Sequence, residues 1–352
     1  MARFSSIDAL RGLTVAAMLL VNNAGDWDHV YPWLEHATWN GCNPADFIFP
    51  FFLLIVGVSL SLAYSSKIEA GSNLKQLKKT LILRGARIVL LGLVLHVIAS
   101  LLIDGRAFRL MGILQRIGIC FTVVGLVHIT WQSARVQWAL IVAILLGYWA
   151  LLSAGTAPDI NLSDKIDTLL LGARAYQYDP ATHLAHDPEG ILGTFPALAT
   201  VLLGVRAGTW LRAGQTRNLV LAGIAGVVLG GLWSLILPLN KQLWTSSFVL
   251  WTAGFGMLAI SLTHYLIDQC NWPAIGKSFG INAIAAYAGS WIGICLLYGT
   301  GAFQPIYRNL FELPLATSVS PEFASFMFSC TFTAIFAVVM KVMAIRGWRI
   351  VI

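Results

Sequence analysis

The chain has 352 residues, of which 57% are hydrophobic and only 11% are charged. Soluble globular domains carry charge on about a quarter of their residues, so this composition excludes an ordinary soluble fold. The formal net charge of +7 does not indicate a nucleic-acid partner, because the basic residues are spread between apolar segments without any nucleic-acid-reading motif. The composition predicts a protein surrounded by membrane lipid.

Ten apolar segments are long enough to cross a bilayer as helices, which takes about 20 residues each. Backbone groups in lipid must be paired internally, and these segments lack the alternation of barrel strands. We therefore predict an all-α, polytopic bundle of about ten or eleven spans, with residues 1–352 forming one domain. The predicted spans are residues 8–24, 46–66, 81–103, 112–132, 136–154, 191–211, 219–237, 244–267, 279–299 and 323–345.

Lys and Arg concentrate on one side of the predicted spans, as they do in short cytoplasmic loops. This places the basic stretches 67–87, 212–217 and 341–349, together with both termini, in the cytoplasm. The long loops 25–45 and 155–190 fall outside and are rich in Trp, Tyr, His, Asp and Asn. Ordered loops of this length usually bind something, so we expect a polar substrate there, although aromatic residues also form the interfacial belt of membrane proteins.

His36 lies in the first of these loops, which follows Asn22 at the end of the first predicted span. An imidazole can take a proton from an attacking amine, or attack a thioester itself. A nearby side-chain amide such as that of Asn22 can donate to the developing oxyanion, and Asp46 can orient the ring. Residue types alone leave both a reactive histidine and an ordinary surface histidine open.

Several charged residues lie within or beside apolar segments, where charge is costly. Arg84 and Arg87, at the inner end of the third span, suit a phosphate-bearing ligand, with cytoplasmic topology as the alternative. Arg116 has no acidic residue in its own helix, so it either pairs across helices or receives an anion. Asp8 and Arg11, three residues apart, are expected to neutralise each other.

Asp187 and Glu189 end the second loop, directly before a predicted helix. Carboxylates there either suit the helix dipole or bind the hydroxyl or amino groups of a sugar. The five cysteines show no metal-ligand spacing, and no metal site is expected.

Five strings of the sequence together resemble one family of transmembrane acyltransferases, which is typified by heparan-alpha-glucosaminide N-acetyltransferase. The resemblance spans nearly the whole chain in order, and its loop motif is the most specific part. The strings are RFSSIDALRGLTVAAMLLVNN, EHATWNGCNPADFIFPFFLLIVGVSLS, RLMGILQRIGIC, HDPEGILGTFPALATVLLGVRAG and NKQLWTSSFVLWTAGFGMLAI.

This resemblance implies acetyl-CoA as the cytosolic donor and the amino group of a glucosamine unit as the extracytoplasmic acceptor. It places the reactive histidine at His36, with Asn22 as its companion, and we expect Trp39 and Asn40 of the same motif to contact the acceptor. It also implies CoA-phosphate contacts on the cytoplasmic face, for which the candidates are Arg84, Arg87, Arg116, Lys277, Lys341 and Arg346.

The large luminal domain of the lysosomal enzyme has no counterpart here, so we expect a short form in a bacterial inner membrane, acting on free glucosamine or another small amino sugar. Two alternatives stay open, a sugar transporter without chemistry and an O-acyltransferase of cell-wall sugars. The sequence also leaves open an acetyl-histidine intermediate or direct transfer, and a monomer or a homodimer.

Overall fold

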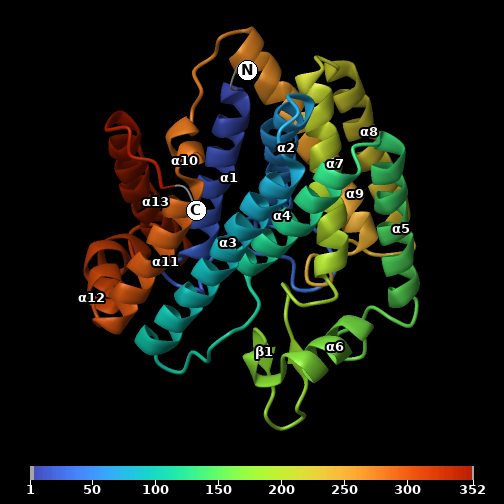
Figure 1. The fold of residues 1–352 in the computed structure, drawn as a ribbon. Helices are drawn as coiled ribbons and strands as arrows, with labels where there is room; N and C mark the ends of the chain where they lie inside the picture. Colours follow the sequence, from blue (N-terminus) through green and yellow to red (C-terminus); the bar gives the residue numbers. More distant parts are fainter. Residues whose placement is uncertain (1–3, 351–352) are drawn as a thin grey trace.

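The computed structural model describes residues 4–350, which form an α-helical bundle with a small cap at one end (Figure 1). Each of the ten predicted apolar segments contains a helix, so the predicted all-α class is confirmed. The long helices are α1 (Ser5–Asn22), α2 (Ile48–Glu69), α3 (Leu74–Leu102), α4 (Ile113–Thr130), α5 (Ala134–Leu152), α7 (Thr194–Arg212), α8 (Thr216–Trp233), α9 (Ser246–Thr263), α11 (Ala283–Gly299) and α13 (Pro321–Ile345). The shorter ones are α6 (Leu162–Leu170), α10 (Lys277–Ile281) and α12 (Phe303–Tyr307), with π-helical turns at His264–Gln269 and Arg308–Ala316.

Among the described residues, eight helical segments are long and apolar enough to cross a membrane, fewer than the ten or eleven spans predicted. A ninth arises if α11 and the helical segment Phe303–Ala316, which bend by 98° relative to each other, count as one span. Helix α1 is not among the eight. It carries the expected ion pair in its first half, where Arg11 Nη1 lies 3.4 Å from Asp8 Oδ1.

Helices α2 and α7 pack closely in the interior of the bundle. A Cβ atom on Gly57 would lie 2.0 Å from the Val201 carbonyl oxygen, and one on Gly204 would lie 2.1 Å from that of Leu54. Only glycine fits at these two positions, and small residues allow membrane helices to approach in this way. In the most apolar 18-residue stretch of α7, 78% of the residues are buried inside the bundle, whereas in that of α8 only 17% are. Helix α8 therefore lies at the edge of the bundle, where lipid covers it.

The start of α2 fixes the loop that carries His36. A 3-10 turn (Pro44–Phe47) precedes the helix, and proline suits its first position because no donor is needed there. Asp46 Oδ2 accepts hydrogen bonds from the backbone nitrogens of Asn43 (2.8 Å) and Ala37 (3.1 Å). These contacts fold residues 36–43 back over the beginning of α2.

The cap consists of residues 153–193 and lies beyond the ends of α5 and α7, at the end of the bundle away from the N-terminus (Figure 1). It contains α6, a 3-10 turn (Gly172–Arg174) and a short antiparallel hairpin of β1 (Gln177–Tyr178) and β2 (Ala185–His186). Hydropathy did not reveal α6, because its polar residues face inward. Asp164 and Asp167 are buried, whereas Leu169 is 81% exposed.

Candidate active site

His36 and Asp46 form the centre of the candidate active site. His36 Nδ1 lies 2.9 Å from Asp46 Oδ1, the distance of an ion pair. No hydrogen bond of good geometry reaches this oxygen among the described residues, so a small rotation of the imidazole is needed for its N–H to point at the carboxylate. The carboxylate is fully buried, whereas the imidazole is 38% exposed. A carboxylate beside Nδ1 favours the tautomer with its proton there, which leaves the Nε2 lone pair available. His36 is therefore equipped to act as a general base or as a nucleophile.

Lys241 joins this pair from the turn between α8 and α9. Its ammonium nitrogen lies 3.6 Å from Asp46 Oδ1, the oxygen that also faces His36. Burial lowers the pKa of Lys241, although the negative charges of Asp46 and Glu189 oppose this effect. Lys241 lies in one of the five family strings, in a short polar break between two apolar segments, but the sequence predicted no role for it at the site.

The turn of Lys241 is attached directly to the loop of His36. The backbone nitrogen of Gly41 donates to the carbonyl oxygen of Leu239 (2.7 Å). The side-chain amide of Asn240 donates to Asn40 Oδ1 (3.2 Å). Asn40, predicted to contact the acceptor, therefore holds these two segments together, and its contact with the acceptor stays a prediction.

Arg109 connects the two acidic residues at the end of the cap. Its Nη2 lies 2.5 Å from Asp187 Oδ1 and also contacts Glu189, while its Nε donates to Asp187 Oδ2 (3.0 Å). Burial disfavours charge on Glu189, but Arg109, Arg116 and Lys241 outweigh this effect and lower its pKa. Both carboxylates thus have a structural partner that sequence reasoning missed, and their binding of a sugar stays a prediction.

Arg116 is fully buried at the same end of the bundle as His36. Its Nη2 donates to the carbonyl oxygen of Gly190 (3.2 Å), and its guanidinium carbon lies 5.2 Å from the centre of the Trp244 ring. Within the described residues, its Nε and Nη1 atoms have no hydrogen-bond partner. The structure therefore places Arg116 beside the cap, whereas a contact with the donor stays a prediction.

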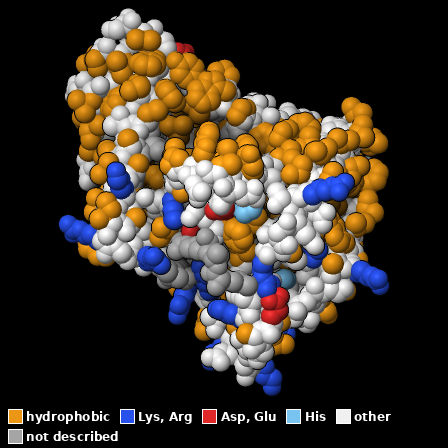
Figure 2. Space-filling view, turned by 90° about the horizontal axis from the view of Figure 1, so that it is seen from above, with side chains coloured by type: hydrophobic (Ala, Val, Ile, Leu, Met, Phe, Trp, Pro, Cys, Tyr) orange, Lys and Arg blue, Asp and Glu red, His pale blue; other side chains and the backbone are white. Residues whose placement is uncertain are grey.

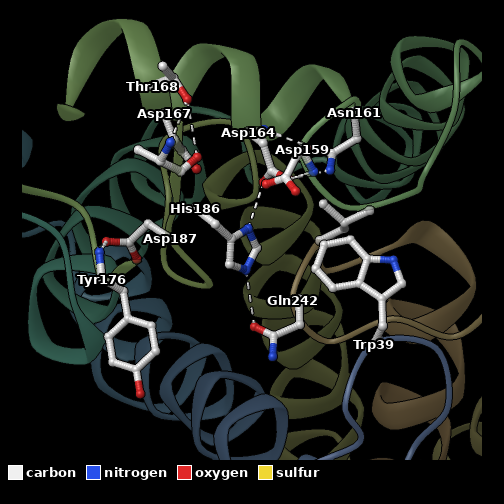
Figure 3. Close-up of polar contacts among 12 residues, drawn as sticks. Trp39, Asp159, Asn161, Asp164, Asp167, Thr168, Tyr176, His186, Asp187 and Gln242 are labelled. Atoms are coloured by element: carbon white, nitrogen blue, oxygen red, sulfur yellow. Dashed lines mark hydrogen bonds and ion pairs between the residues drawn. The ribbon is translucent and has the colours of Figure 1, made fainter. Parts of the chain in front are cut away.

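Trp39 attaches the loop of His36 to the cap. Its indole nitrogen donates to the carbonyl oxygen of Thr156 (2.9 Å), and its ring lies 5.4 Å from that of His186 (Figure 3). Asn22 is exposed at the end of α1, and no hydrogen bond between Asn22 and His36 is found among the described residues. The predicted roles of Trp39 and Asn22 toward substrate stay predictions.

A cavity of about 780 Å³ lies at the other end of the bundle, among α1, α2 and α7. Arg11 Nη2 donates to Ser59 Oγ (3.2 Å) at this cavity, and Arg212 forms an ion pair with Glu69 across its edge. Sequence reasoning did not assign either arginine to a ligand. The lining residues are Phe4, Ile7, Asp8, Arg11, Ser59, Leu62, Ala63, Glu69, Thr209, Arg212 and Ala213.

None of the basic residues predicted to contact CoA is among those lining residues. Lys277 donates to Ser5 Oγ (2.9 Å) near the start of α1, and the Arg84 guanidinium lies 5.4 Å from the Phe121 ring centre. Arg116 lies beside the cap, as described above, and the other three candidates, Arg87, Lys341 and Arg346, are exposed. Figure 2 views the bundle from the N-terminal end, where more Lys and Arg than Asp and Glu side chains are visible. Their contacts with CoA stay predictions.

A family model described as "Heparan-alpha-glucosaminide N-acetyltransferase, catalytic" matches residues 3–243, a region that includes His36, Asp46 and Lys241. The chain belongs to this family. It is 27% identical to heparan-alpha-glucosaminide N-acetyltransferase from Homo sapiens over 353 residues, covering 82% of this chain and 52% of the human protein. The corresponding Mus musculus enzyme is 26% identical over 352 residues, covering 82% of this chain and 53% of its own length.

The chain spans about half the length of these two relatives. The resemblance predicted from the five sequence strings is confirmed by the family match. Together, the apolar helices and the family identify a multi-pass membrane protein of an acyltransferase family.

Proposed function

We propose that this protein is a transmembrane N-acetyltransferase that moves acetyl from cytosolic acetyl-CoA to the amino group of glucosamine or a related amino sugar on the extracytoplasmic side. The observation that carries this proposal is the position of His36 Nδ1 2.9 Å from the buried Asp46 carboxylate, which leaves Nε2 free to react. The names of the two relatives, both N-acetyltransferases, support the reaction type.

The His36–Asp46 pair suits both routes to the product. In the direct route, Nε2 accepts a proton from the amine as it attacks the thioester carbon, and the C–S bond breaks to release the CoA thiolate. In the covalent route, Nε2 itself attacks and forms acetyl-imidazole, and the amine then takes the acetyl group. In both routes CoA leaves as a thiol after gaining a proton. Asp46 stabilises the positive imidazole that forms, as carboxylates do in catalytic triads.

The donor is proposed to enter through the cavity at the N-terminal end of the bundle. Arg11 and Arg212 lie there, and guanidinium groups bind phosphate oxygens through charge-assisted hydrogen bonds. Ser59, the lining residue of α2 that is nearest to Asp46 along the chain, lies 13 residues from it, which separates the cavity from the reactive pair by about 20 Å of helix. The pantetheine arm must therefore extend between helices toward His36. The positive-inside rule supports a cytoplasmic N-terminal end, and a bacterial inner membrane is the proposed location.

Sealed vesicles test this proposal. Acetyl-CoA is loaded inside, glucosamine is supplied outside, and external N-acetylglucosamine is measured for the wild type, His36→Ala and Asp46→Asn. We expect His36→Ala to abolish transfer and Asp46→Asn to reduce it by about 10³–10⁴-fold, because the ring loses its orienting carboxylate. The matched control is His29→Ala, which removes another histidine of the same loop. Equal product from His36→Ala and the wild type would overturn the assignment of His36.

Two further outcomes distinguish the alternatives. Uptake of unmodified sugar without acetylation would replace the enzyme by a transporter, and acetylation of hydroxyl groups alone would replace N-acetyl by O-acetyl transfer. Incubation with labelled acetyl-CoA and no acceptor separates the two routes. Label trapped on His36 under quenched conditions supports the covalent route, whereas its absence supports direct transfer.

A further inference from the structure

A second histidine, His186, lies where the cap, the turn between α8 and α9 and the loop of Trp39 meet (Figure 3). Its Nδ1 lies 2.6 Å from Asp164 Oδ1 on α6, and its Nε2 lies 3.3 Å from Gln242 Oε1 in the turn between α8 and α9. Its ring also packs against Trp39 of the first loop. We call these four residues the cap latch. His186 is the first residue of the family string HDPEGILGTFPALATVLLGVRAG, but the sequence predicted no role for it.

The cap latch borders the reactive pair on two sides. Gln242 directly follows Lys241, whose ammonium group lies 3.6 Å from Asp46. Trp39 lies three residues after His36 in the same loop. The side chain of His186 is only 12% exposed, so its contacts are largely shielded from water. A displacement of His186 would therefore remove one contact between the cap and each segment that carries a reactive group, and among the described residues the loop of His36 would keep only its hydrogen bond from Trp39 to Thr156.

The arrangement of oxygens around His186 suits its protonated form. Both ring nitrogens face an oxygen, and only an imidazole with two N–H groups donates to both. Burial opposes the charge, but the hydrogen bond and charge of Asp164, with smaller effects of Gln242 and Asp187, outweigh it and raise the pKa of His186. Helix α6 contributes the charged groups Asp164, Lys165 and Asp167, of which only Lys165 is exposed, while Asp187 follows His186 in the chain and Lys241 lies in the facing turn.

We propose that His186 is a positioning residue for acetyl transfer, which in its protonated form fastens the cap to the segments carrying His36 and Lys241. Loss of one proton leaves one of the two oxygens without a donor, and the cap is then held less firmly. The proposal rests on the proposed acetyl transfer for its effect on rate, but the attachment of the cap is a property of the fold and is tested separately.

The sign of the pH dependence follows from the raised pKa. A group whose pKa is higher in the folded than in the unfolded chain stabilises the fold most at a pH below its pKa in the unfolded chain, which is about 6.5 for histidine. That contribution is lost as the pH rises through the folded value. Protonation of the acceptor amine lowers activity at acid pH. Loss of the His186 proton is expected to cause a separate decline on the alkaline side.

The test compares the wild type with His186→Gln and with the control His183→Gln, which changes an exposed histidine of the same hairpin. Transfer to external glucosamine is measured while the external pH is varied from about 5.5 to 8.5, the internal pH being held constant. We expect His186→Gln to lower kcat/KM for glucosamine about tenfold at the acid end and to abolish the alkaline decline, because a charge-assisted contact is lost. The KM for acetyl-CoA is expected to stay unchanged.

Thermal unfolding of the same variants in detergent provides a readout without catalysis. We expect the wild type to exceed His186→Gln in Tm at acid pH, and this difference to shrink as the pH rises. An unaltered pH–rate profile in His186→Gln, or a Tm difference independent of pH, would overturn the proposal. If the wild type transfers no acetyl group at any pH, the proposed function fails, and the Tm comparison alone decides whether His186 is a proton-dependent fastening of the cap.

Discussion

The ammonium nitrogen of Lys241 lies 3.6 Å from Asp46 Oδ1, the buried oxygen that also faces His36 at 2.9 Å. One carboxylate oxygen thus lies close to an ammonium and an imidazole that come from segments far apart in the sequence. The lysine helps to keep the buried Asp46 carboxylate ionised. A negative Asp46 is what allows the imidazole to carry positive charge during the reaction.

Replacement of Lys241 by methionine is expected to lower acetyl transfer by about 10–100-fold, because Asp46 then lacks one of its two partners. Initial rates of transfer in sealed vesicles measure the loss. The control is Lys165→Met, which removes an exposed lysine at the same end of the bundle. Wild-type rates in Lys241→Met would contradict this role.

Arg109→Met is expected to destabilise the protein by roughly 3–5 kcal/mol, because it leaves Asp187 and Glu189 as buried charges without their main partner. Thermal unfolding in detergent measures the loss. The exposed Arg174 supplies the control, Arg174→Met, for which we expect little change.

A second variant distinguishes the stability lost with the ion pairs from the stability lost with the packing of the Arg109 side chain. Arg109→Met combined with Asp187→Asn and Glu189→Gln removes the unpaired charges, so it should be more stable than Arg109→Met alone. A triple variant that is less stable than the single one would contradict the electrostatic explanation.

Asp167→Asn is expected to stabilise the protein increasingly as the pH rises. Burial raises the pKa of this carboxyl to about 6, and Asp187 and Asp164 add to the effect. Because the pKa of Asp167 is higher in the folded chain than in the unfolded chain, where it is about 4, the native state is most favoured below pH 4. This advantage is lost as the pH rises through 6. At pH 7.5 the ionised group costs roughly 2–3 kcal/mol, which asparagine avoids.

The measurement is the Tm difference between Asp167→Asn and the wild type, followed from about pH 4.5 to pH 8. Asp159→Asn is the matched control, because Asp159 is exposed in the same cap and has a positive φ of 65°, which asparagine also tolerates. A Tm difference that is independent of pH would show that Asp167 is ionised without penalty, and one that falls with rising pH would show that the fold favours its ionised form.

Arg212→Gln is expected to raise the KM for acetyl-CoA about tenfold and to leave kcat nearly unchanged, because the phosphate contact proposed for Arg212 is remote from the reacting atoms. Initial rates at varied internal acetyl-CoA measure both constants. Arg217→Gln, which changes an exposed arginine at the same end but outside the cavity lining, is the control. A lower kcat with unchanged KM would place the donor elsewhere.

Much of the helical architecture follows from local sequence. Each of the ten predicted apolar segments contains a helix, because burial of backbone groups in lipid leaves a long apolar run few other conformations. Composition was less reliable for the number of spans. Among the described residues, eight or nine helical segments are long and apolar enough to cross a membrane. Helix α1, with Asp8 and Arg11 in its first half, is not one of them.

Hydropathy was least informative in the cap. Helix α6 turns its carboxylates inward and Leu169 outward, the reverse of the usual pattern, so no periodicity argument identified it. The buried side of this helix is polar because it faces His186 and the beginning of α7 instead of an apolar core.

The sequence by itself determined the helical segments, the family and the pairing candidates His36 and Asp46, which are close enough along the chain for one capped turn to bring them together. Only the tertiary structure decided that Lys241, Arg109 and His186 join them. Each of these side chains is placed by contacts between distant segments, and no local pattern of hydropathy or spacing encodes such contacts. The chemistry of the site is therefore recognisable in one loop, whereas its electrostatic environment is a product of the whole fold.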